Sequence, residues 1–245
     1  QKPEVWEFYA AVFKELKDIF PSGTVHLGGD EAPTELWGKC PLCREARTKT
    51  GMKDEQEQMR AFFAKTTVLL AKNGQTPQFW YEGNAGIYHP GETVYAWRQD
   101  QALQSIEKTK KAGLNLIMAS NEYCYLDFPQ IQGQRNWGWM KTTTLQKCYE
   151  LDPAFGKPEK EAGHIRGVHA PVWAERLPDL DHLLYRAYPR ACAIAEAGWS
   201  PMSARSWENF RRKLADHRQF ILKRFNYDMK RTQGNEPAFR WENNK

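Results

Sequence analysis

The chain has 245 residues, of which 41% are hydrophobic, so it is long enough to form one large folded domain or two small ones. Its formal net charge of +5 is a small excess that is spread along the sequence, which argues against a nucleic-acid-binding surface. No apolar run is long enough to form a membrane span. The composition therefore predicts a globular fold and excludes nucleic acid and a membrane span from the expected functions.

Helical and extended patterns alternate along the chain. A helix over residues 4–20 is predicted to bury the apolar positions Val5, Phe8, Val12, Leu16 and Ile19. Further helices are predicted over 54–73, before Gly113, on either side of Pro189, and over 203–225. Strands are predicted over 24–29, 77–82, 93–97, 114–120 and 165–173. This alternation is typical of an α/β protein with a parallel sheet.

Two connecting segments show little periodicity. Residues 32–53 and 121–163 are both predicted to be loops. A loop as long as 121–163 inside a compact domain is usually functional or disordered. Its tyrosines and tryptophans make disorder the poorer interpretation, so this segment is expected to carry functional groups.

The segment 26–32, with the sequence HLGGDEA, joins the first predicted strand to two adjacent carboxylates. If the strand alternation continues through it, Asp30 faces the same side as His26. Val25 and Leu27 then face the opposite side and pack on helices. The same residues also fit a glycine turn followed by two solvated acids. His26 is predicted to support its neighbours rather than to act as a ligand or base.

Aromatic and acidic residues recur where the predicted strands end, at Asp30-Glu31, Trp80-Glu82, Trp97 and Trp173-Glu175. In barrel enzymes the active site lies at the carboxyl ends of the parallel strands, so this pattern favours a site there. The chain contains ten Trp residues, and aromatic rings of this kind stack on sugars as well as filling cores. The strand-end positions of Trp80, Trp97 and Trp173 favour a binding role for these three.

Cys40 and Cys43 have the CxxC spacing, but no second CxxC follows in the chain. A structural zinc site would therefore lack half of its usual ligands. The pair is interpreted as an incidental loop pair or a local disulfide. Neither a metal ion nor another cofactor is expected.

Five segments together resemble the catalytic barrel of the β-N-acetylhexosaminidases of glycoside hydrolase family 20. They are HLGGDEA at 26–32, VYAW at 94–97, YLD at 125–127, VWAE at 172–175 and YPRACAIAEAGWS at 188–200. They occur in the order of the family over nearly the whole chain. The resemblance implies a (β/α)8 TIM barrel of which this chain supplies strands four to eight. Residues 1–226 are then the C-terminal part of the catalytic domain, and residues 227–245 are a polar tail.

The resemblance also implies a reaction. The expected enzyme is a retaining exo-β-N-acetylhexosaminidase that hydrolyses terminal non-reducing β-linked GlcNAc or GalNAc through an oxazolinium intermediate. Two acids that flank a glycosidic bond in ordinary retaining enzymes lie about 5 Å apart on opposite sides, which adjacent residues are poorly suited to do. Here the substrate's own 2-acetamido oxygen attacks the anomeric carbon. Glu31 is implied as general acid and base, Asp30 as the acceptor of the acetamido N–H, and Tyr125 as a donor to the acetamido oxygen.

The remaining site residues come from the same resemblance. The N-acetyl pocket is implied to be walled by Trp80, Trp97 and Trp139, with Trp137 as an alternative to Trp139. Trp173 is implied to stack under the sugar. Glu175 and Asp127 are implied to bind its distal hydroxyl groups.

The chain departs from the family in having five predicted strands instead of eight. The expected partners are therefore a glycan with a terminal β-N-acetylhexosamine and a missing N-terminal barrel segment, from the same or another chain, placed along the free edges of strands 24–29 and 165–173. The family favours a secreted, periplasmic or lysosomal-type compartment. The alternatives are a non-catalytic glycan-binding protein, an inactive fragment of the barrel, or a retaining glycosidase with Glu82 or Glu175 as the nucleophile.

Overall fold

The structure is a computed structural model that describes residues 2–134 and 138–225. The predicted tail at 227–245 and Trp137 lie outside the described residues. The strands are β1 (Thr24–His26), β2 (Thr76–Trp80), β3 (Thr93–Ala96), β4 (Asn115–Met118) and β5 (Ile165–Val168). The longer helices are α1 (Pro3–Ile19), α3 (Pro41–Thr50), α4 (Glu55–Lys72), α5 (Ala102–Lys111), α9 (Leu180–Ala187), α10 (Arg190–Trp199) and α11 (Trp207–Phe225). The short helices are α2 (Thr34–Lys39), α6 (Asn121–Cys124), α7 (Leu145–Tyr149) and α8 (Glu159–Ala162).

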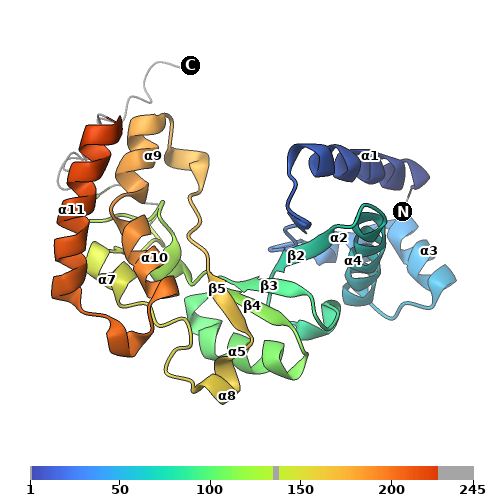
Figure 1. Ribbon diagram of the computed structural model, residues 1–245. Coiled ribbons are helices and arrows are strands. Elements are labelled where there is room, and N and C mark those ends of the chain that lie inside the picture. The colour runs from blue at the N-terminus through green and yellow to red at the C-terminus, as the bar shows by residue number, and fades with distance from the viewer. Residues whose placement is uncertain (1, 135–137, 226–245) are drawn as a thin grey trace. The chain divides into compact units, whose positions relative to one another are not determined.

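The described residues form one five-stranded sheet in the order β1-β2-β3-β4-β5 (Figure 1). β1 pairs with β2 in parallel, with Val25 opposite Pro77, and β2 pairs with β3 in parallel, with Phe79 opposite Val94. All five predicted strands are therefore confirmed, and β1 and β5 are the edges of the sheet. The α/β fold with a parallel sheet is confirmed as well.

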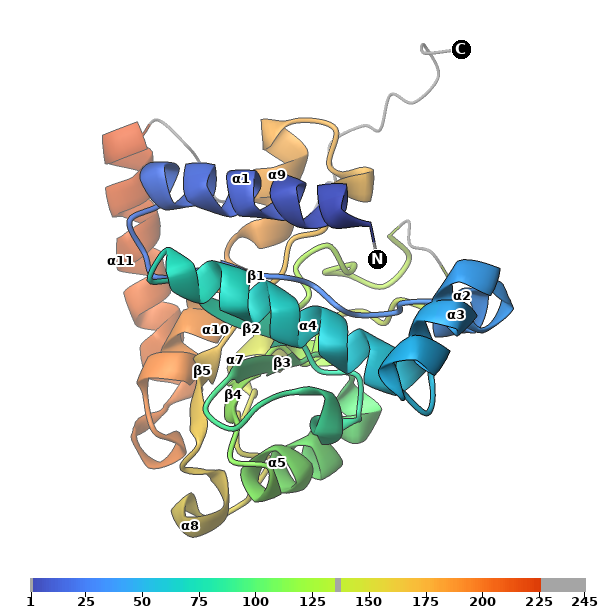
Figure 2. The same cartoon turned by 90° about the vertical axis from the view of Figure 1, so that its right-hand side faces the viewer.

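The chain divides into two compact units. The first comprises the described residues of 1–96, 103–116 and 160–164. In this unit α4 packs against β2, and α1 packs against α4 (Figure 2). Asp54 caps the N-terminus of α4 by accepting a hydrogen bond from the Glu57 backbone amide at 2.8 Å. The buried residues Met59, Phe63, Thr66 and Leu70 of α4 form one face of the helix.

The second unit comprises the described residues of 97–102, 117–159 and 165–245. Its core lies around α10, which packs against α7, α9, α11 and β5 (Figure 1). Ala193, Ile194 and Ala197 of α10 form one buried cluster with Phe210 and Leu214 of α11. Pro189 separates α9 from α10, as predicted, because it cannot continue a helix from the residues before it.

The two segments predicted to be loops contain helices. Residues 32–53 hold α2 and α3, and residues 121–163 hold α6, α7 and α8. The loop prediction was wrong for α2, α6, α7 and α8 because helices of four to six residues show too few turns for a periodic pattern. It was wrong for the ten-residue α3 because that helix buries none of its residues and so has no apolar stripe. α7 is held instead by a Thr144 cap and by burial of Cys148 and Tyr149.

The buried face of α1 also differs from the prediction. Trp6 and Phe13 are buried, whereas Phe8 is 65% exposed and Ile19 is 59% exposed. The ring of Trp6 lies 5.2 Å from that of Phe62 on α4, so the larger aromatic residues face α4. The predicted stripe through Phe8 and Ile19 therefore forms an exposed apolar face of α1 in the first unit.

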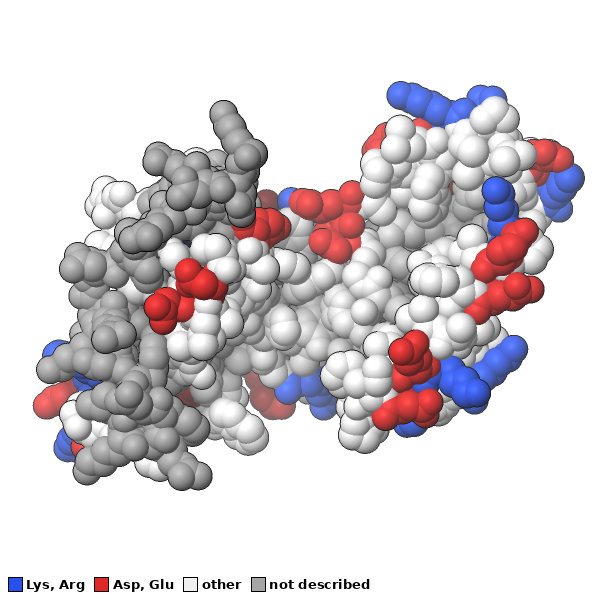
Figure 3. Space-filling model, turned by 90° about the horizontal axis from the view of Figure 1, so that it is seen from above, with Lys and Arg blue, Asp and Glu red and all other residues white. Residues whose placement is uncertain are grey.

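The surface carries charges of both signs. On the face shown in Figure 3, the basic and acidic side chains of the described residues lie interspersed rather than in one broad basic patch. Among the described helices, none is both long enough and apolar enough to cross a membrane.

Candidate active site

The acid pair Asp30-Glu31 follows β1 in the first unit. β1 itself ends at His26, but its ladder with β2 continues through two backbone bonds, from Leu27 N to Gln78 O at 2.8 Å and from Trp80 N to Gly28 O at 2.9 Å. The alternation predicted from His26 to Asp30 is wrong, because Gly28 and Gly29 have φ values of +71° and +98°. The glycines turn the chain before the acids begin.

Gly29 is required where it lies. A Cβ atom at this position would stand 2.7 Å from Cζ of Phe63, closer than any side chain tolerates. Glu31 also adopts a left-handed backbone, with φ of +48°, which a residue other than glycine rarely does. Such strained conformations concentrate at active sites. Asp30 is half-buried and Glu31 is exposed, so the turn presents the pair at the surface of its unit.

His26 connects the turn to the predicted binding residue Trp80. Its Nδ1 accepts a hydrogen bond from the Gly28 backbone amide at 3.1 Å, which places the ring proton of the neutral form on Nε2. The His26 ring lies edge-on to Trp80 at 5.0 Å and to Tyr95 at 4.8 Å. Trp80 itself is 8% exposed, and its carbonyl accepts a hydrogen bond from the Tyr88 hydroxyl. His26 therefore supports the acid turn and Trp80 through contacts with both.

The second unit brings three of the predicted residues together. The Tyr125 ring is stacked with the Trp97 ring at 6.4 Å and 17°, and it lies edge-on to the Trp173 ring at 6.1 Å. Tyr125 is 5% exposed, whereas Trp173 is 37% exposed. The three rings come from three different connections, after β3, after β4 and after β5. The sheet order thus gathers residues that are far apart in the sequence.

Trp139 joins this aromatic cluster through a residue that the sequence did not single out. Phe128 is 1% exposed and lies edge-on to Tyr125 at 5.6 Å and to Trp139 at 5.4 Å. Trp139 remains 61% exposed. Phe128 lies three residues after Tyr125 in an otherwise irregular segment. This spacing was the only sign in the sequence that Phe128 contacts Tyr125.

Asp127 and Glu175 are also neighbours in the second unit. Burial raises the pKa of the Asp127 carboxyl to about 6. A hydrogen bond from the Trp173 backbone amide opposes this rise in pKa, whereas the charge of the nearby Glu175 carboxylate adds to the rise. Asp127 Oδ1 is buried without a hydrogen-bond partner among the described residues. Glu175 is exposed in the short 3-10 helix Ala174–Arg176. A buried carboxylate oxygen without a donor suits a ligand that brings a hydroxyl group.

Arg190 fixes the backbone of this site and was not predicted. It is fully buried on α10, and burial lowers the pKa of its guanidinium to about 10. Its Nη1 donates to the carbonyl of Thr143 at 2.9 Å, and its Nη2 donates to the carbonyls of Arg186 and Leu126. Leu126 is the residue between the two candidate sugar-binding residues of the YLD motif. A charged residue directly before the apolar run of α10 was the signal in the sequence.

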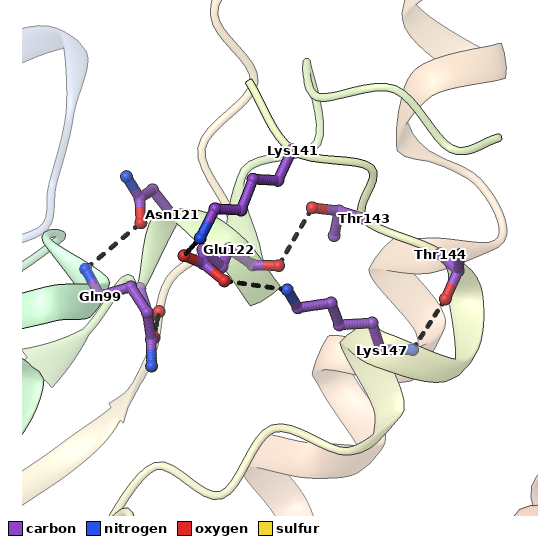
Figure 4. Close-up of polar contacts among 8 residues, drawn as sticks. Gln99, Asn121, Glu122, Lys141, Thr143, Thr144 and Lys147 are labelled. Carbon is purple, nitrogen blue, oxygen red and sulfur yellow. Dashed lines mark hydrogen bonds and ion pairs between the residues drawn. The ribbon is translucent and has the colours of Figure 1, made fainter. Parts of the chain in front are cut away.

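The Glu122 carboxylate holds residues 141–147 in the same segment through two lysines (Figure 4). The carboxylate forms ion pairs with Lys141 and Lys147. The backbone carbonyl of Glu122 accepts a hydrogen bond from the Thr143 hydroxyl at 3.0 Å. Burial opposes ionisation of Glu122, but the hydrogen bonds from the two lysines outweigh it and lower the pKa of the carboxyl. These bonds tie Glu122 of α6, three residues before Tyr125, to residues 141–147.

Replacing Arg190 by Met should lower the free energy of unfolding by at least about 3 kcal/mol, because three buried carbonyls each lose a donor worth roughly 1 kcal/mol or more. Urea unfolding followed by tryptophan fluorescence measures this change. Arg211→Met is the matched control, since Arg211 is exposed on α11. Equal losses in the two variants would show that the Arg190 bonds contribute no stability.

Asp127 should make stability depend on pH. Its pKa in the folded chain, about 6, lies above its ordinary value of 3.8, so the folded chain holds a proton that the unfolded chain has released between these values. The free energy of unfolding should therefore fall as pH rises from about 4 to about 6. Asp127→Asn should flatten this slope, whereas Asp216→Asn, on the exposed side of α11, should not. An unchanged slope in Asp127→Asn would contradict the assignment.

Residues 1–202 match the family model of the glycosyl hydrolase family 20 catalytic domain. The chain belongs to glycoside hydrolase family 20. The TIM-barrel fold class implied by the sequence is confirmed, and the five-stranded sheet is a part of that catalytic domain. The family is one of glycosyl hydrolases.

Three relatives show how much of a family 20 protein the chain covers. It is 93% identical over 245 residues to a β-hexosaminidase of Akkermansia muciniphila, covering 100% of this chain and 50% of the relative. A crystal structure of a β-N-acetylhexosaminidase has 92% sequence identity and a TM-score of 0.95, covering 99% of this chain and 52% of that one. The exo-β-N-acetylglucosaminidase of Vibrio harveyi, solved with N-acetylglucosamine, has 25% identity and a TM-score of 0.80, covering 89% and 35%. The chain thus spans about half the length of the Akkermansia relative.

Proposed function

We propose that this chain supplies the acid pair and the sugar-binding aromatic residues of a retaining exo-β-N-acetylhexosaminidase. Its substrates are glycans with a terminal non-reducing β-linked GlcNAc or GalNAc. Residues 1–226 belong to the catalytic barrel. The observation that carries the proposal is the Asp30-Glu31 turn at the end of β1, in a chain of family 20.

The two acids take different roles in the reaction. The substrate's 2-acetamido oxygen attacks the anomeric carbon while Glu31 protonates the departing glycosidic oxygen. Glu31 then takes a proton from the water that opens the oxazolinium intermediate. Asp30 accepts a hydrogen bond from the acetamido N–H and stabilises the positive charge that develops there. Exposure of Glu31 and half-burial of Asp30 support this division, since only Glu31 must reach water.

The groups that hold the sugar are residues of the second unit and Trp80 of the first unit. Tyr125, between Trp97 and Trp173, donates its hydroxyl to the acetamido oxygen. The exposed face of Trp173 stacks under the sugar ring, and Trp80, Trp97 and Trp139 wall the N-acetyl group. Asp127 and Glu175 accept hydrogen bonds from the distal hydroxyls, and the unpartnered Oδ1 of Asp127 supports this role.

The proposal includes a further barrel segment, from the same or another chain. Two observations support it. β1 and β5 are the edges of a sheet that has five strands in the described residues, and open edges pair readily with other strands. α1 also carries Phe8 and Ile19 on an apolar face. The half of the Akkermansia relative that this chain does not match provides the polypeptide for that segment.

Co-expression of this chain with that unmatched half tests the proposal. The complex should release 4-nitrophenol from 4-nitrophenyl N-acetyl-β-glucosaminide, and the complex with Asp30→Asn should release far less. Binding of N-acetylglucosamine without turnover would instead show a glycan-binding protein. A covalent sugar adduct trapped on Glu82 or Glu175 would show a protein nucleophile, which the proposal excludes.

A further inference from the structure

Trp97 and Tyr125 lie on two different connections of the second unit, and one residue joins these connections. Trp97 directly follows β3, and Tyr125 is the C-cap residue of α6, which follows β4. The backbone N–H of Asn121, the first residue of α6, donates to the Trp97 carbonyl at 2.8 Å. The Asn121 carbonyl in turn accepts a hydrogen bond from the Tyr125 N–H at 3.4 Å. Asn121 therefore links the two aromatic positions through its backbone.

Side chains add two further bonds between the same connections. Oδ1 of Asn121 accepts a hydrogen bond from the Gln99 backbone N–H at 3.3 Å (Figure 4). Oε1 of Gln99 accepts one from the hydroxyl of Ser120, the residue before Asn121. We refer to Gln99, Ser120 and Asn121 as the Asn121 clamp. It holds the segment that carries Trp97 against the start of α6.

The clamp connects two rings that are each supported within their own segment. The Trp97 and Tyr125 rings lie 6.4 Å apart and are inclined by only 17°. Cζ of Arg98 lies over the Trp97 ring, 4.2 Å from its centre, within the range of a cation–π interaction. The buried Phe128 lies edge-on to Tyr125 at 5.6 Å. The position of one ring relative to the other therefore depends on the bonds between the segments.

Removing the Asn121 side chain would loosen this connection. Gln99 and Asn121 are both half-buried, so the Gln99 N–H would lose its acceptor where water reaches it only in part. A backbone donor without a partner is unfavourable in such a place, and the segment would move toward water to satisfy it. Trp97 lies two residues before Gln99 and would move with it. The surface formed by Trp97 would then shift relative to Tyr125.

We propose that the Asn121 clamp sets the size of the acyl group that the sugar site accepts, and so selects N-acetyl over longer N-acyl substrates. The inference rests on the proposed function, in which Trp97 walls the N-acetyl group and Tyr125 donates to its oxygen. A hydrophobic pocket discriminates against one extra methylene by roughly 10–200-fold, which requires walls that do not yield. Asn121 is a positioning residue, because it acts through Trp97 and Tyr125.

The co-expressed complex with the unmatched half of the Akkermansia relative allows the test. Its kcat/KM should be roughly 10–200-fold higher for 4-nitrophenyl N-acetyl-β-glucosaminide than for the N-propanoyl compound. Asn121→Ala, which removes the Oδ1 acceptor, should lower this ratio at least about fivefold. Asn121→Asp, which keeps an acceptor oxygen at the same position, should retain the ratio. Asn209→Ala is the matched control, since it removes an acceptor from an exposed hydrogen bond with Arg212 on α11, and it should also retain the ratio.

The ratio separates the clamp from a purely structural role. Partial loss of folded complex lowers both rates alike and leaves their ratio unchanged. Gln99→Ala removes the acceptor of the Ser120 hydroxyl and provides a second variant of the clamp, which should shift the ratio in the same direction.

Two results would contradict the inference in different ways. An active complex whose ratio is unchanged in Asn121→Ala and Gln99→Ala would overturn the role of the clamp and leave the proposed function standing. An unaltered complex that releases 4-nitrophenol from neither substrate would contradict the proposed function, and the inference with it.

Discussion

Glu31→Gln is expected to reduce hydrolysis of alkyl N-acetyl-β-glucosaminides by roughly 10²–10⁴-fold, the range that general acid catalysis contributes. Alkoxide leaving groups need a proton as the glycosidic bond breaks, and glutamine cannot supply it. Aryl glycosides such as the 4-nitrophenyl compound leave without much protonation, so their loss should be far smaller. The ratio of the rates on alkyl and aryl glycosides, measured in the complex with the missing segment, shows directly whether Glu31 is the proton donor.

Glu35→Gln is the matched control for this variant. Glu35 lies four residues away on α2, and its side chain is exposed. The control should retain the rates of the unaltered complex on both substrates. An equal loss on alkyl and aryl glycosides in Glu31→Gln would assign the proton donor to another residue.

Asp30→Asn is expected to lower kcat by roughly 10²–10³-fold with a much smaller change in KM, as loss of a group that stabilises transition-state charge does. The carboxylate acts on the positive charge that appears as the acetamido oxygen attacks, and it has little of this charge to act on in the bound substrate. Steady-state kinetics with 4-nitrophenyl N-acetyl-β-glucosaminide separate the two constants.

Asp18→Asn controls for the loss of one carboxylate from the first unit, since Asp18 is exposed on α1. Its kinetic constants should not change. A rise in KM with an unchanged kcat in Asp30→Asn would make Asp30 a binding residue only.

The elements with long apolar patterns were predicted well from the sequence. Each predicted strand contains the observed one or overlaps it, and α4 begins one residue after its Asp54 cap. α1 was placed correctly, but its buried face was not. The apolar residues of α1 allow either of two faces of the helix to be the buried one. The contact of Trp6 with Phe62 on α4 determines which face is buried. A contact of this kind depends on tertiary packing, which one helix's periodicity does not contain.

The sequence predicted side chains that lie close together where strand ends bring them to one edge of the sheet, and it missed contacts that depend on packing. Trp97, Tyr125 and Trp173 lie together because their strands share a sheet. Arg190 and Phe128 were missed because their roles arise from burial against distant segments. The alternation argument for Asp30 failed at Gly28 and Gly29, whose positive φ values end the strand pattern.

If the substrate's acetamido group performs the nucleophilic step at Asp30 and Glu31, a substrate without that group should hardly react. Comparing 4-nitrophenyl N-acetyl-β-glucosaminide with 4-nitrophenyl β-glucoside, which has a hydroxyl in place of that group, tests it in the co-expressed complex. The glucoside should react at least about a thousandfold more slowly, since an oriented internal nucleophile contributes at least that much. Comparable kcat values for the two substrates would contradict the account, because the enzyme would then need a nucleophile of its own.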